Sequence, residues 1–327
     1  MDKMTIKQVD AFTTTPFGGN PAGVITNGAG LGTEEMLRIA GEMNLTETAF
    51  IVPAESDDAA HRIRFFTPSG EVDLSGHVVI AATWALAEEG RVWLGDGVTT
   101  VVFETNAGRI SVDLEFQSVP DPHTGGDRVA LRTETLCGEL HRIMMHQEIH
   151  GHRESPVPAG EIAEILGIPA GEITGTGLPI EMISVGLDML MIPVTSKEAI
   201  RDMNPDLIQL GILDRKYGID TNHVFTTDTF NADCTSYARH FAPALGMLED
   251  PGTGTAAAAL GTYLVRHGIV TAGRMIMEQG NDQSALARII AEVEEQAGGV
   301  ESALIGGLAV TSISRRITIE NDSIVIA

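Results

Sequence analysis

An internal repeat constrains the fold of this chain more than any other feature of the sequence. The segment 64–68, RFFTP, reappears at 239–243 as RHFAP, and a glycine follows each copy within three residues. Two pairs of less similar segments precede these copies. NPAGVI at 20–25 matches LPIEMI at 178–183, and ETAFI at 47–51 matches TNHVF at 221–225. Because a repeated segment indicates a repeated structural unit, we predict two similar halves.

Each half leads into one long apolar run, VVIAATWALAEEG after residues 75–77 and AAAALGTYLVRHG after residues 253–255. Both runs are apolar around nearly the whole helical circumference, which is typical of a helix enclosed by protein on all sides. Gly90 and Gly268 stand where a left-handed glycine would end each helix. The enclosing sleeve must consist of strands, which short alternating or β-branched runs supply at 62–66, 98–104, 109–114, 181–185 and 317–326.

The repeat also suggests where the chain divides. A chain of 327 residues is long enough for two domains, and the segment 117–126, QSVPDPHTGG, has the prolines and glycines of a linker. We place a first half at 1–120 and a second at 121–310, with the final strand near 311–327 available to pack back on the first half. Further helices are expected at 34–43 and 161–167.

Composition limits the partners. With 45 acidic and 21 basic residues the formal charge is −24, which repels phosphate backbones and anionic lipids, so neither nucleic acid nor a membrane is an expected partner. The amino terminus lacks the apolar core of a signal peptide and no segment has the apolar length of a membrane span, so we expect a cytoplasmic protein.

Cys137 and Cys234 form no CxxC or metal-ligand spacing, and we expect them to be buried small hydrophobic residues.

The starts of the two apolar helices are candidate ligand sites. A helix that begins after a glycine inside a protein directs backbone N–H groups and the positive end of its dipole outward, which favours an anion such as a carboxylate. The alternative is that side chains at these starts simply cap the helices. Because the repeat gives two such starts in matching positions, we expect both to face one cleft. The lining residues would be Ser75, Gly76 and His77 at one start and Asp250, Thr253, Gly254 and Thr255 at the other.

Glu47 is the candidate acid/base residue. It stands just ahead of an apolar strand in NLTETAFI, where it is either a solvated strand edge or a carboxylate beside the cleft. A carboxylate in a closed cleft is desolvated, which raises its pKa and suits a base that must later return the proton. His77, at a helix amino terminus, would be biased towards the neutral form.

These segments together resemble the phenazine-biosynthesis PhzF-like family of isomerases. The resemblance rests on DAFTTTPFGGNPAGV, NLTETAF, FFTPSGEVDLSGHVVIAA, GLPIEM and RHFAPALGMLEDPGTGTAAAALGTYL, which occur in order from Val9 to about Gly280. It implies an α+β fold like that of diaminopimelate epimerase. In that fold, two pseudo-symmetric halves each wrap a barrel-like, mostly antiparallel sheet around a central buried helix.

The resemblance also implies roles. Glu47 falls on the family's acid/base glutamate, His77 on the histidine at the first helix and Asp250 on the aspartate of the Glu-Asp-Pro segment, while Thr255 replaces a usual serine and Thr46 lies in the substrate pocket. The best-described family reaction isomerises trans-2,3-dihydro-3-hydroxyanthranilate and uses no metal or organic cofactor. A homodimer and a small carboxylate substrate are implied in the same way.

Two alternatives stay open at the level of sequence. The fold also houses amino-acid racemases and epimerases, which use a cysteine at each helix start, whereas this chain has Ser75 and Thr253 there and no thiol. A serine hydroxyl is too weakly acidic to replace a thiol without an adjacent base. The second alternative is a non-catalytic small-molecule-binding protein. The stretch 279–293, QGNDQSALARIIAEV, also lacks the Gly-Arg-Pro-Ser segment common in relatives.

Metal and nucleotide sites are not expected. Four histidines cluster in ELHRIMMHQEIHGH, and two of them have the i, i+4 spacing of a helical metal pair, but no HExxH motif or carboxylate set accompanies them. The glycine-rich segments 17–20 and 175–177 lack the lysine of a phosphate loop and the spacing of a dinucleotide fingerprint. The clustered histidines are His141, His146, His150 and His152.

Overall fold

The computed structural model describes residues 4–124, 127–133, 136–294, 302–320 and 323–326. The chain divides into two compact units, Met1–Met145 with Gly306–Ala327 and His146–Ile305. It passes from one unit to the other within strand β9 (Cys137–Glu148) and returns within strand β18 (Ser302–Gly307).

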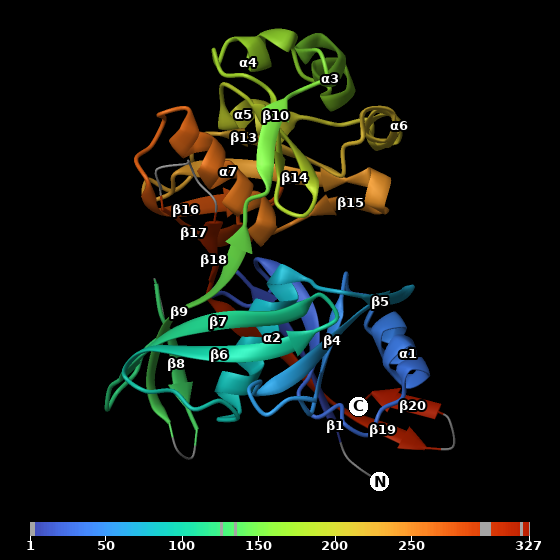
Figure 1. The fold of residues 1–327 in the computed structure, drawn as a ribbon, viewed down its shortest axis with the longest axis vertical. Coiled ribbons are helices and arrows are strands. Elements are labelled where there is room, and N and C mark those ends of the chain that lie inside the picture. Colours follow the sequence, from blue (N-terminus) through green and yellow to red (C-terminus); the bar gives the residue numbers. More distant parts are fainter. Residues whose placement is uncertain (1–3, 125–126, 134–135, 295–301, 321–322, 327) are drawn as a thin grey trace. The chain divides into compact units, whose positions relative to one another are not determined.

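Unit 1 is a mostly antiparallel sheet with two helices (Figure 1). Its sheet runs through antiparallel pairs β19–β1, β1–β2, β3–β4, β6–β7 and β7–β9, and parallel pairs β2–β3 and β4–β6. The elements besides β9 are β1 (Met4–Ala11), β2 (Asn20–Ile25), α1 (Thr33–Met43), β3 (Thr48–Val52), β4 (His61–Thr67), β5 (Gly70–Val72), α2 (Gly76–Glu88), β6 (Gly97–Thr105), β7 (Gly108–Ser118), β8 (Val129–Arg132), β19 (Ala309–Glu320) and β20 (Ser323–Ile326).

Helix α2 is buried from His77 through Ala87, and it contacts β1, β2, β3, β8 and β19. Most of its side chains are small or branched apolar residues, and they occur on every face, so the helix is stable where the surrounding strands exclude water. Gly90 ends it in the left-handed region with φ 64°, as the sequence predicted. Gly268 ends the corresponding apolar helix of unit 2 in the same way, with φ 65°.

Unit 2 combines a sheet with helices on it. Strand β13 pairs parallel with β12 and antiparallel with β14, and β14 continues to β15 and to β16, which pairs with β17. The elements are β10 (Gly151–Glu154), α3 (Ala159–Leu166), α4 (Ala170–Thr174), β11 (Glu181–Ser184), β12 (Asp188–Pro193), α5 (Lys197–Asp202), α6 (Leu207–Tyr217), β13 (Thr221–Thr226), β14 (Ser236–Ala242), η1 (Pro243–Leu245), β15 (Met247–Asp250), α7 (Gly254–Arg266), β16 (Gly273–Gln279) and β17 (Ala287–Val293).

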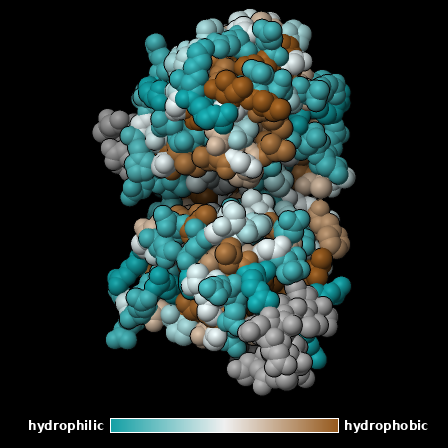
Figure 2. Space-filling view, turned by 90° about the vertical axis from the view of Figure 1, so that its right-hand side faces the viewer, coloured by the Kyte–Doolittle hydropathy of each residue, from teal (hydrophilic) through white to brown (hydrophobic). Residues whose placement is uncertain are grey.

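The two faces of strands β12–β14 bury different residues because side chains alternate along a strand. Val224 of β13 joins a core formed with α3, α5 and α6, which includes Ile162, Ile200 and Leu213. Its neighbour Phe225 contacts Tyr263 of α7, with ring centroids 5.1 Å apart. Around α6 and β15 the surface carries exposed apolar side chains (Figure 2), namely Ile208, Ile212, Leu245 and Leu248.

The repeated segments form equivalent local contacts. In both copies the arginine makes a two-point ion pair with a glutamate and lies 5.1 Å from the ring centroid of the phenylalanine two residues later. The sets are Arg64 with Glu71 and Phe66, and Arg239 with Glu249 and Phe241. This local match explains the repeat, while pseudo-symmetry of the whole units and a barrel around each central helix stay predictions.

The structure confirms two predicted helices and moves the predicted division of the chain. Helices α1 and α3 confirm the segments 34–43 and 161–167 to within one or two residues. The segment 117–126 does not divide the units, because β8 and β9 pair back towards β7 and keep the chain in unit 1 as far as Met145. The predicted final strand is two strands: β19 pairs with β1 along the whole of Met4–Ala11, and β20 pairs with β19, so both lie in unit 1 (Figure 1).

The cysteines correct one expectation. Both are free thiols, but Cys137 is exposed and Cys234 is only partly buried, so neither is a core residue. Cys137 lies at the start of β9, where alternation turns its side chain outward. Burial raises the pKa of Cys234 to about 12, which keeps it a thiol at neutral pH. In the described part of the chain, no helix has the length and apolar character needed to cross a membrane.

Candidate active site

Glu47 lies directly before β3, at the end of the sheet where β2 and β3 both begin. The N–H of Gly23 donates to its carbonyl oxygen at 3.1 Å, and Gly23 is paired with Thr48 in the parallel ladder. A Cβ on Gly23 would lie 2.5 Å from Oγ1 of Thr48, so only glycine allows the two strands to approach this closely. The main chain therefore fixes where the Glu47 side chain starts.

The carboxylate of Glu47 meets His77, the second residue of α2. Their side chains are 14% and 8% exposed, and Oε2 of Glu47 lies 3.5 Å from Nε2 of His77. This contact excludes the solvated strand edge as the environment of Glu47. Thr46 precedes Glu47 and is half-buried beside it.

Burial lowers the pKa of His77 to about 4, so its imidazole is neutral at pH 7. Nδ1 lies 3.3 Å from Oγ of Ser75. In the tautomer with hydrogen on Nε2, the Ser75 hydroxyl donates to Nδ1, and the Nε2 side of the ring lies beside the Glu47 carboxylate. Ser75, His77 and Glu47 are thus neighbours in one polar cluster.

The alternative that Ser75 and Thr253 cap their helices does not hold. Ser75 occupies the position before α2 and Thr253 the position before α7, yet neither side chain accepts a hydrogen bond from its helix. Instead, the Ser75 hydroxyl is beside His77, and the Thr253 hydroxyl donates to Oδ2 of Asp250. The helix starts therefore have no side-chain cap, although both positions carry residues well suited to provide one.

In unit 2, Asp250 is the last residue of β15 and is 5% exposed. Gly254 and Thr255 are the first two residues of α7, so they lie in its first turn, as predicted. The structure brings Asp250 and Thr253 into contact within unit 2, and Glu47, Ser75 and His77 into contact within unit 1. That both sets serve one ligand stays a prediction.

Gln279, the last residue of β16, is a site residue that sequence reasoning missed. Its side-chain amide accepts from the N–H of Thr253 at 3.1 Å and donates to the carbonyl oxygen of Asp250 at 2.7 Å and to Oγ1 of Thr253 at 2.9 Å. A glutamine at the end of a strand carries no signal of such contacts, because its partners lie about 26 residues earlier in the chain.

A buried histidine pair was also missed. His223 and His240 are cross-strand neighbours whose Nδ1 atoms lie 3.2 Å apart, and His240 is also paired in the ladder with Asp250. Burial lowers the pKa of His240 to about 3 and that of His223 well below 6.5, so both are neutral and one donates to the other. The signal was present in the repeat, where RHFAP has a histidine at the position of Phe65.

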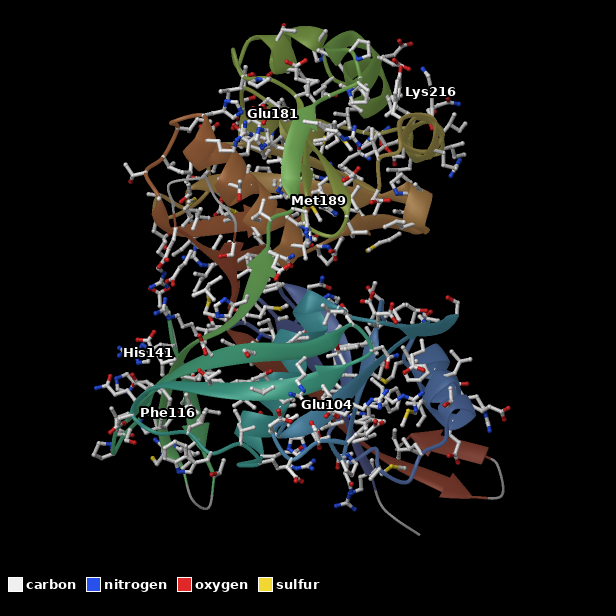
Figure 3. The ribbon with its side chains drawn as sticks, viewed as in Figure 1. Glu104, Phe116, His141, Glu181, Met189 and Lys216 are labelled. Carbon is white, nitrogen blue, oxygen red and sulfur yellow. The ribbon has the colours of Figure 1, made fainter. Side chains whose placement is uncertain are left out.

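The histidine cluster at 141–152 does not form a metal pair. His141, labelled in Figure 3, and His146 lie on strand β9, and His152 lies on β10, so the helical i, i+4 spacing does not apply. Within the described ranges, no group of three or more histidine, cysteine, aspartate or glutamate side chains could hold a metal ion.

Comparison with known proteins gives a consistent result. The family model described as phenazine biosynthesis-like protein (PhzC-PhzF) matches residues 9–315. An uncharacterized isomerase of Deinococcus radiodurans is 33% identical over 309 residues, covering 92% of this chain and 91% of that protein. The uncharacterized isomerase YfhB of Bacillus subtilis is 31% identical, covering 96% of this chain and 99% of that protein.

Solved structures agree with the sequence match. A phenazine biosynthesis protein of the PhzF family from Bacillus anthracis superposes with a TM-score of 0.81 at 27% identity, covering 98% of this chain and 100% of that chain. A probable proline racemase from Agrobacterium radiobacter gives a TM-score of 0.56 at 14% identity, covering 97% of this chain and 93% of that chain, which shows a shared fold alone.

Proposed function

Because the chain belongs to the phenazine biosynthesis-like PhzC-PhzF family, whose relatives here are named isomerases, we propose that it moves a proton within a small carboxylate-bearing substrate. Glu47 is the group that removes the proton and returns it at another carbon. The contact between Glu47 and His77 carries this proposal, because it holds a carboxylate in a largely buried place beside an imidazole that is neutral at pH 7.

The neutral state of His77 matters for this chemistry. A protonated imidazole or a guanidinium next to Glu47 would stabilise the carboxylate and make it a weaker base. A neutral ring instead orients the carboxylate through Nε2 and adds no positive charge. One carboxyl group can then accept a proton and deliver it again, so the proposed reaction requires no cofactor.

The substrate carboxylate fits the uncapped helix starts. The first turns of α2 and α7 present backbone N–H groups that the side chains of Ser75 and Thr253 do not cap, with the positive end of the helix dipole behind them. Each of these turns is proposed to be able to bind a carboxylate, with Thr46 as a further contact in unit 1 and Thr255 in unit 2. The first compound to test is trans-2,3-dihydro-3-hydroxyanthranilate, which the family resemblance suggests.

A two-thiol racemase is the weaker alternative. Its mechanism needs a thiol at each helix start, whereas Ser75 and Thr253 occupy these positions and the two cysteines lie on β9 and just before β14. The Thr253 hydroxyl donates to the Asp250 carboxylate and not towards a ligand, and an alcohol is a far weaker acid than a thiol.

The deciding experiment replaces Glu47 by glutamine, which keeps the shape of the side chain and removes its basicity. Purified protein is incubated in deuterated water with the dihydrohydroxyanthranilate and a panel of cyclic and acyclic carboxylates, and deuterium incorporation is followed by NMR. We expect the Glu47→Gln variant to lose turnover by about a thousandfold, in the range for a general acid/base, while binding of anthranilate changes little. Glu42→Gln, an exposed change on α1, is the matched control.

Each alternative has its own outcome in that experiment. Deuterium at the α-carbon of an amino acid with loss of optical rotation would establish a racemase. Ligand binding with no exchange in any compound would establish a binding protein. Turnover that survives Glu47→Gln at the unmodified rate would refute the role of Glu47.

A further inference from the structure

Strand β16 ends on two buried polar residues that point to opposite sides, as consecutive residues of a strand do. Oε2 of Glu278 accepts from the N–H of Phe230 at 2.9 Å and Oε1 from that of Asn231 at 3.0 Å, so Glu278 holds a loop. Gln279, 2% exposed, turns the other way and holds the segment Asp250–Thr253 that opens α7. One strand end therefore fixes two separate loops.

The hydrogen bonds of Gln279 have a defined direction. Its Oε1 accepts from the N–H of Thr253, and its Nε2 donates to the carbonyl oxygen of Asp250 and to the Thr253 hydroxyl oxygen. Because that oxygen already accepts from Gln279, the hydroxyl hydrogen is left for Oδ2 of Asp250, to which it is donated. The chain Gln279, Thr253, Asp250 thus fixes the orientation of the Asp250 carboxylate.

The same contacts explain why Thr253 does not cap α7. Capping would require its oxygen to face the helix N–H groups, but the amide of Gln279 holds the hydroxyl towards Asp250. The first turn of α7 is therefore left without a side-chain cap. Only an amide supplies one acceptor and two donors here, since a carboxylate donates nothing and a hydrocarbon neither donates nor accepts.

We propose that Gln279 is a positioning residue for the isomerisation, which holds Asp250 in its working orientation and keeps the first turn of α7 open to the substrate carboxylate. This inference rests on the proposed function, because it assigns Gln279 its role through Asp250 and the start of α7. Gln279 itself is not placed in contact with the substrate.

Three variants of the full-length protein test the proposal. Gln279→Met keeps the approximate volume and removes all three hydrogen bonds, whereas Gln279→Glu keeps the acceptor and removes the donors at neutral pH. Glu278→Gln is the matched control, since it perturbs an equally buried side chain on the same strand without touching the 250–253 turn. Melting temperature and far-UV circular dichroism verify the fold of each variant.

Two readouts separate positioning from general damage. Calorimetric titration measures the binding of anthranilate, with its uncharged amide as the control ligand, and kinetics on the substrate found by the deuterium screen give kcat and KM. We expect Gln279→Met to weaken anthranilate binding and lower kcat by about tenfold each, the loss typical of a buried hydrogen bond. We expect Glu278→Gln to keep both values even where it lowers the melting temperature.

The pH profile adds a signature that a structural role would not produce. In the Gln279→Glu variant, protonation restores a donor, so its activity relative to the unmodified protein should rise as pH falls from 8 to 5. Unchanged anthranilate affinity and kcat in folded Gln279→Met would overturn the proposal, as would failure of the unmodified protein to bind anthranilate. Gln279-dependent binding without any isomerisation would refute the proposed function and support only the part of the proposal in which Gln279 keeps the first turn of α7 open to a carboxylate.

Discussion

Asp214 in α6 illustrates what burial does to a single residue. Its side chain is fully buried, and Nδ2 of Asn222 donates to its Oδ1 at 2.8 Å. Burial raises the pKa of Asp214 to about 6 from the ordinary 3.8. Above that value, the folded protein holds a carboxylate that water would solvate better, so the ionised form of Asp214 destabilises the fold at neutral pH.

We therefore predict that Asp214→Asn stabilises the protein at pH 7.5 by about 2 kcal/mol. The folded state binds the Asp214 proton more tightly than the unfolded state. The contribution of Asp214 to the free energy of unfolding therefore becomes more favourable as pH falls from about 6 towards 3.8. The advantage of the variant should accordingly shrink at pH 4.5. Urea unfolding at both pH values measures the difference in free energy of unfolding between the variant and the unmodified protein. Asp206→Asn, at the start of the same helix, is the control. An equal effect at both pH values would contradict this account.

Among the elements, the paired strands β13 and β14 carry a buried cross-strand pair that differs in chemistry from the matching pair of β3 and β4. The register pairs Ala49 with Phe65 in unit 1 and His223 with His240 in unit 2. An apolar pair is insensitive to pH, whereas two buried neutral histidines are not. At low pH the unfolded chain protonates both residues, while the folded chain keeps them neutral.

Stability from this pair is therefore present above pH 6.5 and is lost as pH falls towards about 3, by roughly 1.4 kcal/mol per pH unit for each histidine. We predict that the double variant His223→Ala, His240→Phe, which installs the unit 1 pair, loses less stability between pH 7 and 5 than the unmodified protein. Chemical unfolding at pH 7, 6 and 5 tests this. Parallel stability curves for the two proteins would show that the pair does not titrate on unfolding.

At the scale of the whole molecule, the chain builds unit 1 from both of its ends. Strand β19 pairs with β1 along Met4–Ala11, and Oγ1 of Thr311 accepts from Nε1 of Trp84 on α2 at 3.1 Å. Strand β19 is therefore part of the core of unit 1, in which its Ile317 packs with Met4 and Ile6. Both tryptophans, Trp84 and Trp93, lie in unit 1, so their fluorescence reports on this unit.

We predict that a chain ending at residue 305 does not form the native unit 1, because β1 would lose a full row of backbone hydrogen bonds in the interior. The buried Trp84 should then become solvated, which appears as red-shifted emission and a lost near-ultraviolet circular dichroism signal. The full-length Thr311→Val variant, which removes the hydrogen bonds of this hydroxyl to Trp84 and Glu88 and keeps the strand, should retain both signals. Native emission from the shortened chain would contradict the prediction. The expected homodimer and cytoplasmic location stay predictions at this scale.

The sequence alone determined the repeat, both enclosed helices and the glycines that end them, because periodicity and φ preference are local properties. Sequence reasoning also selected Glu47 and His77, which the structure joins at 3.5 Å. Tertiary structure decided the contacts between distant segments: Gln279 on Asp250 and Thr253, β19 beside β1, and the division at Met145 instead of the 117–126 segment. Those contacts depend on which strands pair in three dimensions, and neither composition nor spacing along the chain encodes that pairing.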